Sequence, residues 1–445
     1  MKFLTRTARV YIIIFTLAIL YYFHETIIAV ASIKEIIPPT YDAKISESKF
    51  VEIVSSTDVD GPFDTTPLKE LCSKKVPTPG LVFTCNKANG GIGNVRNQLL
   101  GCIRYAIEAG GGLVMPRPVV RAKNLIKTGT GITTDFEYFF DKKHFISVVK
   151  EACPNLKIYE SEEGLNRLPD VLYPQTLGGE IVMGQIISEP EWWRERFDVW
   201  LSNQTRTIGM PTEQDPLLIE FDQTLLLRQP VNADGAQFRD TFGRILQHRT
   251  DIRQLAATTL YQLAQQFQIP LDPTASIHAE GYFGAHLRTE ADALRAFGDA
   301  DFNTQSDQYI EQARSANLSV LYVATGSPDE LAKMAVKAWS QAGLNVTSKY
   351  QLLPPADAMY LKNMSWDQQA LVDYEILLKA SSFGGFVKST FAWNIALRRH
   401  IVSKVDDPYP GNICFLDEFS HIYGEHDYKR RKNPWTATIP YAMWP

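Results

Sequence analysis

Three short stretches of the sequence combine residue types that suit the binding of an anion. The first is Gly-Gly-Ile-Gly-Asn at 90–94, between the apolar run 81–85 and a helical pattern. A glycine-rich turn that opens a helix directs backbone N–H groups and the positive end of the helix dipole at one point, which favours a phosphate. The alternative is a simple turn in which Asn94 caps the helix, since asparagine is a preferred capping residue.

The second stretch, His-Leu-Arg-Thr-Glu-Ala-Asp at 286–292, ends a predicted strand. Alternation along that strand places His286 and Arg288 on one face, at the carboxyl edge where open α/β sheets bind ligands. The Arg288 guanidinium suits a diphosphate because its planar fork donates two hydrogen bonds and stays charged. Glu290 and Asp292 would then contact an acceptor or hold Arg288. A cluster of surface ion pairs is the alternative.

The third stretch, 380–391, combines a predicted strand, a turn and the start of a helix. Ser389 and Thr390 offer two hydroxyls beside the amides of a helix N-terminus, and these groups suit phosphate oxygens. Phe391 would face a base or a ribose. A capped helix with a phenylalanine in the core is the alternative.

Other common site types find little support in the sequence. A dinucleotide fingerprint needs a third glycine where Arg96 stands and an acid after the second strand, where Arg117 and Arg121 follow instead. The D-x-D triplets at 58–60 and 299–301 have the spacing of divalent-cation sites, but they lie in polar segments and are expected to be solvated. The histidines show no H-E-x-x-H spacing, and no G-x-S-x-G elbow is present. We therefore expect no metal.

The overall composition is that of an ordinary globular protein. The chain has 445 residues, of which 45% are hydrophobic, with 45 Lys+Arg against 50 Asp+Glu and a net charge of -5. This balance argues against a disordered chain and against nucleic acid as a partner, because a surface that follows phosphates is usually strongly basic. The positive groups expected to matter are few: Arg288, with Arg96 and Arg117 as further candidates.

Hydrophobic periodicity predicts two α/β halves around these stretches. Strands at 81–85 and 113–116 enclose an amphipathic helix that ends at the Gly110–Gly112 run, whereas 160–275 is mostly helical in pattern. The second half has predicted strands and helices at 282–287, 318–324, 327–343, 366–380, 383–387 and 390–399. This organisation predicts two Rossmann-like domains that face a cleft.

The N-terminus predicts entry into the secretory pathway. Basic residues in 1–9 precede the apolar stretch 10–31, which is long enough for one transmembrane helix. We expect a cytoplasmic tail at 1–9, a signal anchor at 10–31 and a stem at 32–78, followed by an N-terminal Rossmann-like domain with a helical insertion at 79–275 on the acceptor side and a C-terminal one at 276–445 on the nucleotide-sugar side. The protein is thus expected in the Golgi or ER membrane, single-pass type II, with a lumenal catalytic domain. A cleaved signal peptide is the alternative, because 29–31 has the A-x-A pattern.

Sequons and cysteines agree with a lumenal location. N-x-[ST] acceptor sites are present at Asn203, Asn317, Asn345 and Asn363. Five cysteines allow at most two disulfides. Cys102 is expected to remain a thiol because it lies in the amphipathic helix, and the pairing of the other four stays open.

Together, the three stretches resemble the GDP-fucose protein O-fucosyltransferase family. The turn at 90–94 is similar to the family's glycine-rich G-x-x-N loop. The 286–292 stretch is similar to its H-x-R motif in the form common in plant and fungal members, and 389–391 to its [ST]-[ST]-F segment. Asp373 stands where the family has a nucleotide-contacting acid. The resemblance spans about residues 80–400, although the family often has Ser at the position of Thr390.

This resemblance implies a GT-B fold and an inverting transfer of fucose from GDP-fucose to a protein or glycan acceptor, without a metal or other cofactor. Arg288 would contact the diphosphate, Asn94 would lie beside the reacting centre, and Glu290 is the candidate base. The implied substrate-binding residues are Gly91, Gly93, His286, Asp292, Asp373, Ser389, Thr390 and Phe391. Among these, Asp373 would recognise guanine or its ribose, and His286 would support Arg288. The alternatives are a GT-B enzyme for another nucleotide sugar and an inactive lumenal sugar-binding protein.

Overall fold

The structure is a computed structural model of the chain. It describes residues 45–122, 124, 129–173, 181–182, 185–186, 190–222, 230–296, 301–409, 413–425, 439 and 441–445. Among these residues, no helix combines the length and the apolar character that a membrane span requires. The predicted tail and signal anchor at 1–31 lie outside the described residues. Residues 47–445 form one compact unit, which contains both predicted α/β halves.

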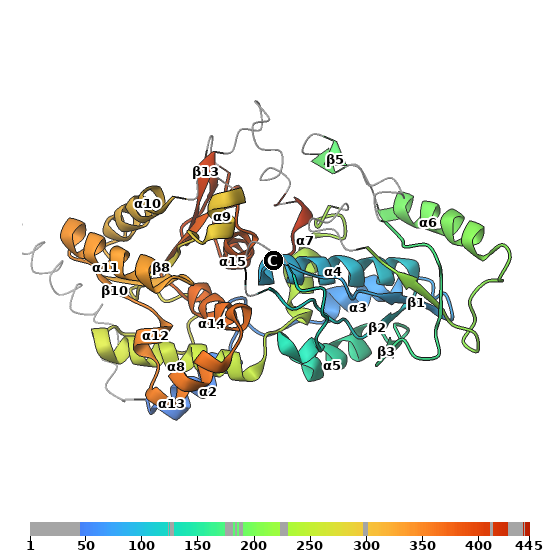
Figure 1. The fold of residues 1–445 in the computed structure, drawn as a ribbon, viewed down its shortest axis with the longest axis horizontal. Coiled ribbons are helices and arrows are strands. Elements are labelled where there is room, and N and C mark those ends of the chain that lie inside the picture. The colour runs from blue at the N-terminus through green and yellow to red at the C-terminus, as the bar shows by residue number, and fades with distance from the viewer. Residues whose placement is uncertain are drawn as a thin grey trace, which may run out of the picture. The chain divides into compact units, whose positions relative to one another are not determined.

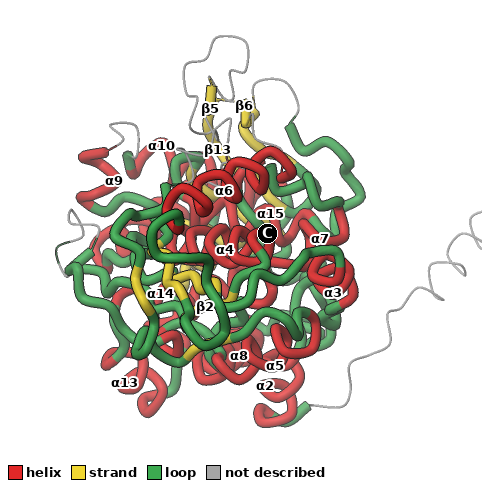
Figure 2. The backbone as a smooth tube through the Cα atoms, turned by 90° about the vertical axis from the view of Figure 1, so that its right-hand side faces the viewer, coloured by secondary structure: helices red, strands yellow, loops and turns green. Residues whose placement is uncertain are grey.

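The first half is built on a parallel five-stranded sheet with the order β3-β2-β1-β7-β4. Its strands are β1 (Leu81–Thr84), β2 (Gly112–Val114), β3 (Ile158–Tyr159), β4 (Asn166–Arg167) and β7 (Leu217–Glu220). The helices and 3-10 turns of this half are α3 (Thr66–Ser73), α4 (Ile92–Ala109), η1 (Phe136–Tyr138), α5 (Lys142–Ala152), α6 (Pro190–Thr205), α7 (Ala236–Phe242) and η3 (Gly243–Ile245), with a small hairpin of β5 (Ile181–Val182) and β6 (Gln185–Ile186). Figures 1 and 2 show α4 running beside the strands of this sheet.

The predicted strand–helix–strand unit at the start of this half is confirmed. β1 is buried along its whole length, and α4 begins after Gly91 and ends at Gly110. Gly110 has φ +66°, a left-handed conformation that glycine adopts without steric strain and that commonly ends helices. Because α4 follows β1 directly, the Gly90–Gly91 turn lies at the carboxyl edge of the first sheet.

The second half is built on a six-stranded sheet with the order β10-β9-β8-β11-β13-β12. Its strands are β8 (Phe283–His286), β9 (Val320–Ala324), β10 (Asn345–Thr347), β11 (Ser382–Phe386), β12 (Ile413–Leu416) and β13 (Ser420–Glu425), all parallel to their neighbours except β12. The remaining helices are α2 (Glu47–Ser56), α8 (Thr250–Phe267), α9 (Ala291–Ala296), α10 (Phe302–Ser315), α11 (Pro328–Ala342), α12 (Lys349–Leu352), α13 (Pro355–Asn363), α14 (Trp366–Leu378) and α15 (Thr390–His400). All the strands and helices predicted for this half are present.

The strand order of the second sheet creates a switch point between β8 and β11. The chain passes from β8 outward through β9 to β10, then returns to β11 on the other side of β8. Ligands of open α/β sheets bind in the crevice at the carboxyl ends of such strands. The segments that follow β8 and β11 are the second and third predicted stretches, so the topology brings them to one place.

The middle of the chain differs from the prediction of a mostly helical segment. β7 lies there and completes the first sheet between β1 and β4, but its apolar run is only three residues long and too short to show a period. The later part of this segment is helical as predicted, but it is divided into α7, η3 and α8. α8 packs against α14 and α12, although the predicted boundary at 275/276 assigned it to the first half.

The predicted stem at 32–78 is wrong from Glu47 onward, because two helices of that segment belong to the compact unit. α2 packs on α8 through Phe50 and Val54, which lie one helical turn apart and are buried. α3 packs on α5 and α7. These helices are short, and only two or three residues of each are buried, which is why their periodicity is weak in the sequence.

Two disulfides lie in the first half. Cys72 pairs with Cys153, and Cys85 pairs with Cys102. The expectation that Cys102 remains a thiol is therefore wrong: its face of α4 meets the end of β1, with a Cα–Cα distance of 6.0 Å to Cys85. Cys414, which is buried, takes part in neither bond.

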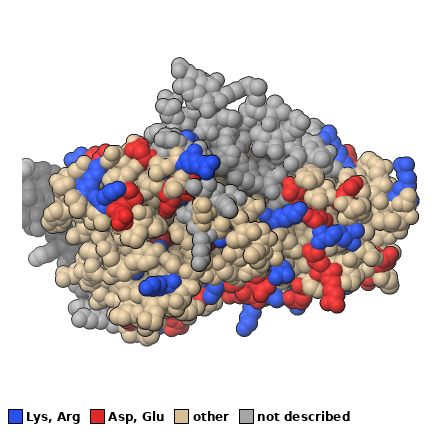
Figure 3. Space-filling model, viewed as in Figure 1, with Lys and Arg blue, Asp and Glu red and all other residues tan. Residues whose placement is uncertain are grey.

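The described surface carries mixed charge. On the face shown in Figure 3, basic and acidic side chains are interspersed without a broad patch of one sign. The four sequon asparagines are exposed, on α6, in the turn before β9, on β10 and at the end of α13; they are Asn203, Asn317, Asn345 and Asn363.

Candidate active site

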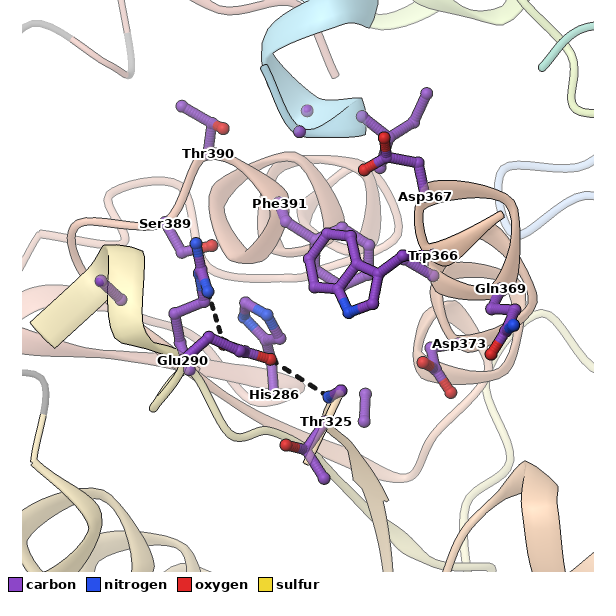
Figure 4. A pocket seen from close by; sticks show the side chains of 18 of the residues that line it. His286, Glu290, Thr325, Trp366, Asp367, Gln369, Asp373, Ser389, Thr390 and Phe391 are labelled. Carbon is purple, nitrogen blue, oxygen red and sulfur yellow. Dashed lines mark hydrogen bonds and ion pairs between the residues drawn. The ribbon is translucent and has the colours of Figure 1, made fainter. Parts of the chain in front are cut away.

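The three predicted stretches converge on one cavity of about 320 Å³ between the start of α4 and the carboxyl edge of the second sheet (Figure 4). Every predicted catalytic and substrate-binding residue lines it: Gly91, Gly93, Asn94, His286, Arg288, Glu290, Asp292, Asp373, Ser389, Thr390 and Phe391. The convergence joins segments that are about 300 residues apart in the sequence. Short motifs could predict the members of the site, but only the sheet topology explains their meeting.

The start of α4 is pressed against the start of α15. A Cβ atom on Gly93 would lie 2.7 Å from the backbone nitrogen of Phe391, so only glycine permits this approach. The Thr390 hydroxyl donates a hydrogen bond to the side-chain oxygen of Asn94. The residue that caps α4 is Gly91, so the alternative role of Asn94 as a helix cap is wrong. Asn94 lies instead in the first turn and connects the two halves at the cavity.

Arg288 is held by two carboxylates at the end of β8. Its guanidinium donates to Glu290 and, at 2.7 Å, to Asp292. Arg121 donates to the same Asp292 oxygen at 2.8 Å. Burial disfavours the charge of Arg288, but the two acids more than compensate and raise its pKa above the ordinary value. An arginine has five N–H donors, so these two bonds leave donors for an anionic ligand.

Glu290, the predicted base, has both carboxylate oxygens engaged. One oxygen accepts from Arg288, and the other accepts from the backbone N–H of Gly326 at 3.1 Å. These contacts connect the end of β8 to the end of β9, as the dashed lines in Figure 4 show. They favour a positioning role for Glu290.

The start of α15 supplies amides and a ring. Ser389 caps the helix by accepting from the N–H of Ala392, and Thr390 begins the first turn. The ring of Phe391 lies 4.7 Å, centroid to centroid, from the ring of His286. Burial, together with nearby Arg288, lowers the pKa of His286 to about 3, so this imidazole is neutral at physiological pH.

Asp373 lines the cavity from α14 but is already paired. It forms an ion pair with Lys349 at 2.5 Å and accepts a hydrogen bond from the Tyr322 hydroxyl at 2.7 Å. Burial raises the pKa of Asp373, although Lys349 opposes the rise. Its predicted contact with guanine or ribose stays a prediction.

Several residues that line the cavity were not predicted. They include Arg121, Thr325, Lys349, Tyr350, Trp366, Asp367 and Gln369. Arg121 was visible only as a basic residue after the second strand, and Trp366 and Asp367 only as a helix start. The side chains of Trp366 and Asp367 reach the cavity through the packing of α14 beside α4, which no local pattern shows.

Two arginines expected to matter lie elsewhere. Arg96 is buried and donates to the backbone carbonyls of Trp444 and Pro445. Arg117 lies outside the cavity lining and is exposed. Arg121 is thus the basic residue of this region that reaches the cavity.

The D-x-D triplet at 58–60 is structural. Asp58 and Asp60 are paired with Arg398, at 2.5 and 3.1 Å, and with Arg244. The expectation of solvated carboxylates is therefore wrong here, because the side chain of Asp60 is almost completely buried. Asp301 caps α10, and residue 299 lies outside the described residues. Within the described part of the chain, no group of three or more His, Cys, Asp or Glu side chains has the geometry of a metal site.

Known structures and a family model resemble this chain. POFUT1 in complex with GDP is 14% identical, with 79% of this chain and 99% of that chain covered and a TM-score of 0.43. POFUT1 in complex with GDP-fucose is 15% identical over the same shares, with a TM-score of 0.44. A mutant of Arabidopsis thaliana FUT1 in complex with GDP is 14% identical, with 79% and 76% covered and a TM-score of 0.38. No curated protein matches the chain significantly.

The family model described as GDP-fucose protein O-fucosyltransferase matches residues 81–402. This range includes all three motif stretches and both sheets up to β11. The resemblance predicted from the motifs is confirmed: the chain belongs to the GDP-fucose protein O-fucosyltransferase family and is a fucosyltransferase.

Proposed function

We propose that this protein transfers fucose from GDP-fucose to an acceptor hydroxyl, with inversion at the anomeric carbon and without a divalent cation. The observation that carries the proposal is the convergence of the three family motifs, from both halves, on one cavity. The position of this cavity, with one sheet on each side, supports a GT-B fold in which the donor lies between the two halves.

The cavity has a place for each part of the donor. The diphosphate would contact Arg288 and the amides at the start of α15, since both attract phosphate oxygens. The nucleoside would lie toward Phe391 and Asp373, and the fucose toward Asn94. The acceptor would approach from the side of α4.

The charges explain how transfer would proceed without a metal. As the bond between the fucose and the β-phosphate breaks, negative charge grows on the phosphate oxygens. Arg288, fixed by Glu290 and Asp292, would stabilise that charge in the role that a divalent cation plays elsewhere. Preorganised donors of this kind need no rearrangement during the reaction.

We further propose that the protein works in the lumen of the Golgi or ER as a type II membrane protein anchored by residues 10–31, with a protein or glycan acceptor. Two disulfides and four exposed sequon asparagines support an oxidising, glycosylating compartment. Fluorescence microscopy of the full chain, with glycosidase digestion, tests the location. An unglycosylated cytosolic protein would contradict it.

The activity is tested with a panel of nucleotide sugars, in which thermal shift reports binding and GDP release reports turnover. We expect GDP-fucose to stabilise the protein more than GDP-mannose or UDP-sugars, and GDP release to continue in excess EDTA. Loss of activity in EDTA that Mg²⁺ or Mn²⁺ restores would contradict the metal-free mechanism. Preference for another donor would indicate a different transferase, and tight GDP binding without turnover would indicate a binding protein.

A further inference from the structure

In the proposed reaction, the acceptor hydroxyl must lose its proton as it attacks the donor. Some group in the cavity must accept this proton, and its identification rests on the proposed function. A general base needs an oxygen or nitrogen that points into the cavity and is not already engaged. Its pKa must also be close to the working pH. The described acids that line the cavity are Glu290, Asp292, Asp367 and Asp373.

Three of these acids are paired. Glu290 accepts from Arg288 and from a backbone N–H, and Asp292 accepts from Arg288 and Arg121. Asp373 is held by Lys349 and by a tyrosine hydroxyl. Proton transfer to any of them would break an ion pair.

Asp367 is different. Its side-chain Oδ1 is buried and has no hydrogen-bond partner among the described residues, and the residue is only 3% exposed. Figure 4 shows its carboxylate at the edge of the cavity, directed toward the ribbon of α4, and α14 contacts α4. A buried polar atom without a partner is unfavourable and calls for an explanation. The fourth acid therefore faces the side from which the acceptor would approach.

The local structure fixes Asp367 in this position. Ser365 and Gln368 form a reciprocal capping box at the start of α14, and Gln368 also donates to the backbone carbonyl of Tyr138. The Arg121 guanidinium lies over the ring of Trp366, with its central carbon 5.0 Å from the ring centroid. The turn therefore has little freedom to move Asp367 toward a partner.

The surroundings of Asp367 determine the pKa of its carboxyl group. The basic groups that face the cavity are Arg121, Arg288, Lys349 and Lys388. The other acids are paired as described, and His286 is neutral. Burial raises the pKa of Asp367 to about 7, although Arg121 and Arg288 oppose the rise. Its carboxylate form therefore becomes the major one as the pH rises through the neutral range.

We infer that Asp367 is the general base of the transfer reaction. Its carboxylate takes the proton of the acceptor hydroxyl as that oxygen forms a bond to the anomeric carbon of fucose. The bond between this carbon and the β-phosphate oxygen breaks, and GDP leaves with the electron pair. Asp367, now a carboxylic acid, returns its proton to solvent when the products leave.

The test uses the full chain, with water and azide as the nucleophiles. Hydrolysis of GDP-fucose needs a proton to be removed from water, so Asp367→Asn should lower GDP release by at least about 100-fold. Azide carries no proton to remove. It should therefore restore GDP release in the variant roughly tenfold or more and give fucosyl azide. GDP affinity, measured by calorimetry, should remain near the wild-type value.

A matched control separates the base from a general effect of charge. Asp329 occupies the same position in α11, two residues after the capping serine, but it is exposed and does not line the cavity. Asp329→Asn should hydrolyse GDP-fucose at the wild-type rate. The wild-type rate should rise with pH through about 7, and Asp367→Asn should lose this dependence.

The outcomes distinguish this inference from the proposed function. Wild-type protein that neither binds nor cleaves GDP-fucose would overturn both. Cleavage by wild type together with undiminished hydrolysis by Asp367→Asn, or a loss that azide does not restore, would overturn the base assignment alone. Loss of GDP affinity with an unchanged pH profile would make Asp367 a nucleotide-binding residue instead.

Discussion

Two clusters in this protein have the same composition, two arginines and two acids, and different surroundings. The core cluster consists of Arg244, Arg398, Asp58 and Asp60. The cavity cluster consists of Arg121, Arg288, Glu290 and Asp292.

The remaining donors of the two clusters point to different partners. In the core cluster, Arg244 also donates to the backbone carbonyls of Gly61 and Pro62, and the cavity beside the cluster measures only about 20 Å³. The cavity cluster instead opens onto a space of about 320 Å³ beside Asp367, whose Oδ1 has no hydrogen-bond partner in the described part of the chain. Pairing alone therefore does not identify a functional arginine; unoccupied space and a neighbouring unpaired acid do.

The largest effect should come from breaking the core cluster. Arg398→Ala would leave Asp58 and Asp60 facing each other with only Arg244 for compensation. Removing one partner of a buried ion pair costs about 3–5 kcal/mol, so the free energy of unfolding measured in urea should fall by about this amount. Turnover per folded molecule should stay unchanged, because Arg398 lies outside the cavity lining.

The control is a solvent-exposed ion pair on the surface of the protein. Arg314 pairs with Glu311 on α10, and both side chains are exposed. Arg314→Ala should leave the urea midpoint within experimental error, since surface pairs contribute little. If both arginine variants unfold alike, the core cluster does not stabilise the fold as its burial indicates.

Breaking the cavity cluster should lower the activity and leave the stability of the fold nearly unchanged. Arg288→Ala removes the cation next to the proposed β-phosphate position. Loss of one preorganised donor costs about 3–4 kcal/mol of transition-state stabilisation, so GDP release from GDP-fucose should fall by about 10²–10³-fold. The fold should survive, because Arg121 still pairs with Asp292 and Gly326 still bonds Glu290. Near wild-type turnover would remove Arg288 from the mechanism.

The comparison also shows what the sequence can and cannot predict. The motif at 286–292 follows a clear apolar strand, so its position at a sheet edge and its arginine were predictable. The triplet at 58–60 lies in a polar segment, and its burial depends on arginines about 185 and 340 residues further along the chain. The local periodicity of the sequence gives no indication of such a long-range contact.

The same limit explains the remaining differences. β7 was missed because a buried three-residue run has no period, and α2 because only two of its residues are buried. Asp367 was missed for a related reason: an acid in the first turn of a helix is common and favourable. Only the position of α14 beside the cavity makes this acid unusual.

The smallest effect, and the sharpest test of the comparison, is the stability of Asp367→Asn as a function of pH. Burial raises the pKa of Asp367 from its ordinary value of 3.8 to about 7, so the fold favours the protonated acid. This contribution is fully present below pH ~4 and is lost as the pH rises through about 7. Asparagine does not ionise, so the variant should gain stability relative to wild type over this interval.

A tenfold change in proton affinity is worth about 1.4 kcal/mol, and water in the cavity reduces the total, so we expect a gain of about 2–3 kcal/mol. Urea unfolding of both proteins from pH 4 to pH 8 measures it, with Asp329→Asn as the control that should show no such gain. A pH-independent difference would mean that Asp367 is paired in solution like the core acids. A gain that coincides with the loss of hydrolysis would show that the unpaired acid destabilises the fold where it serves catalysis, as active-site groups commonly do.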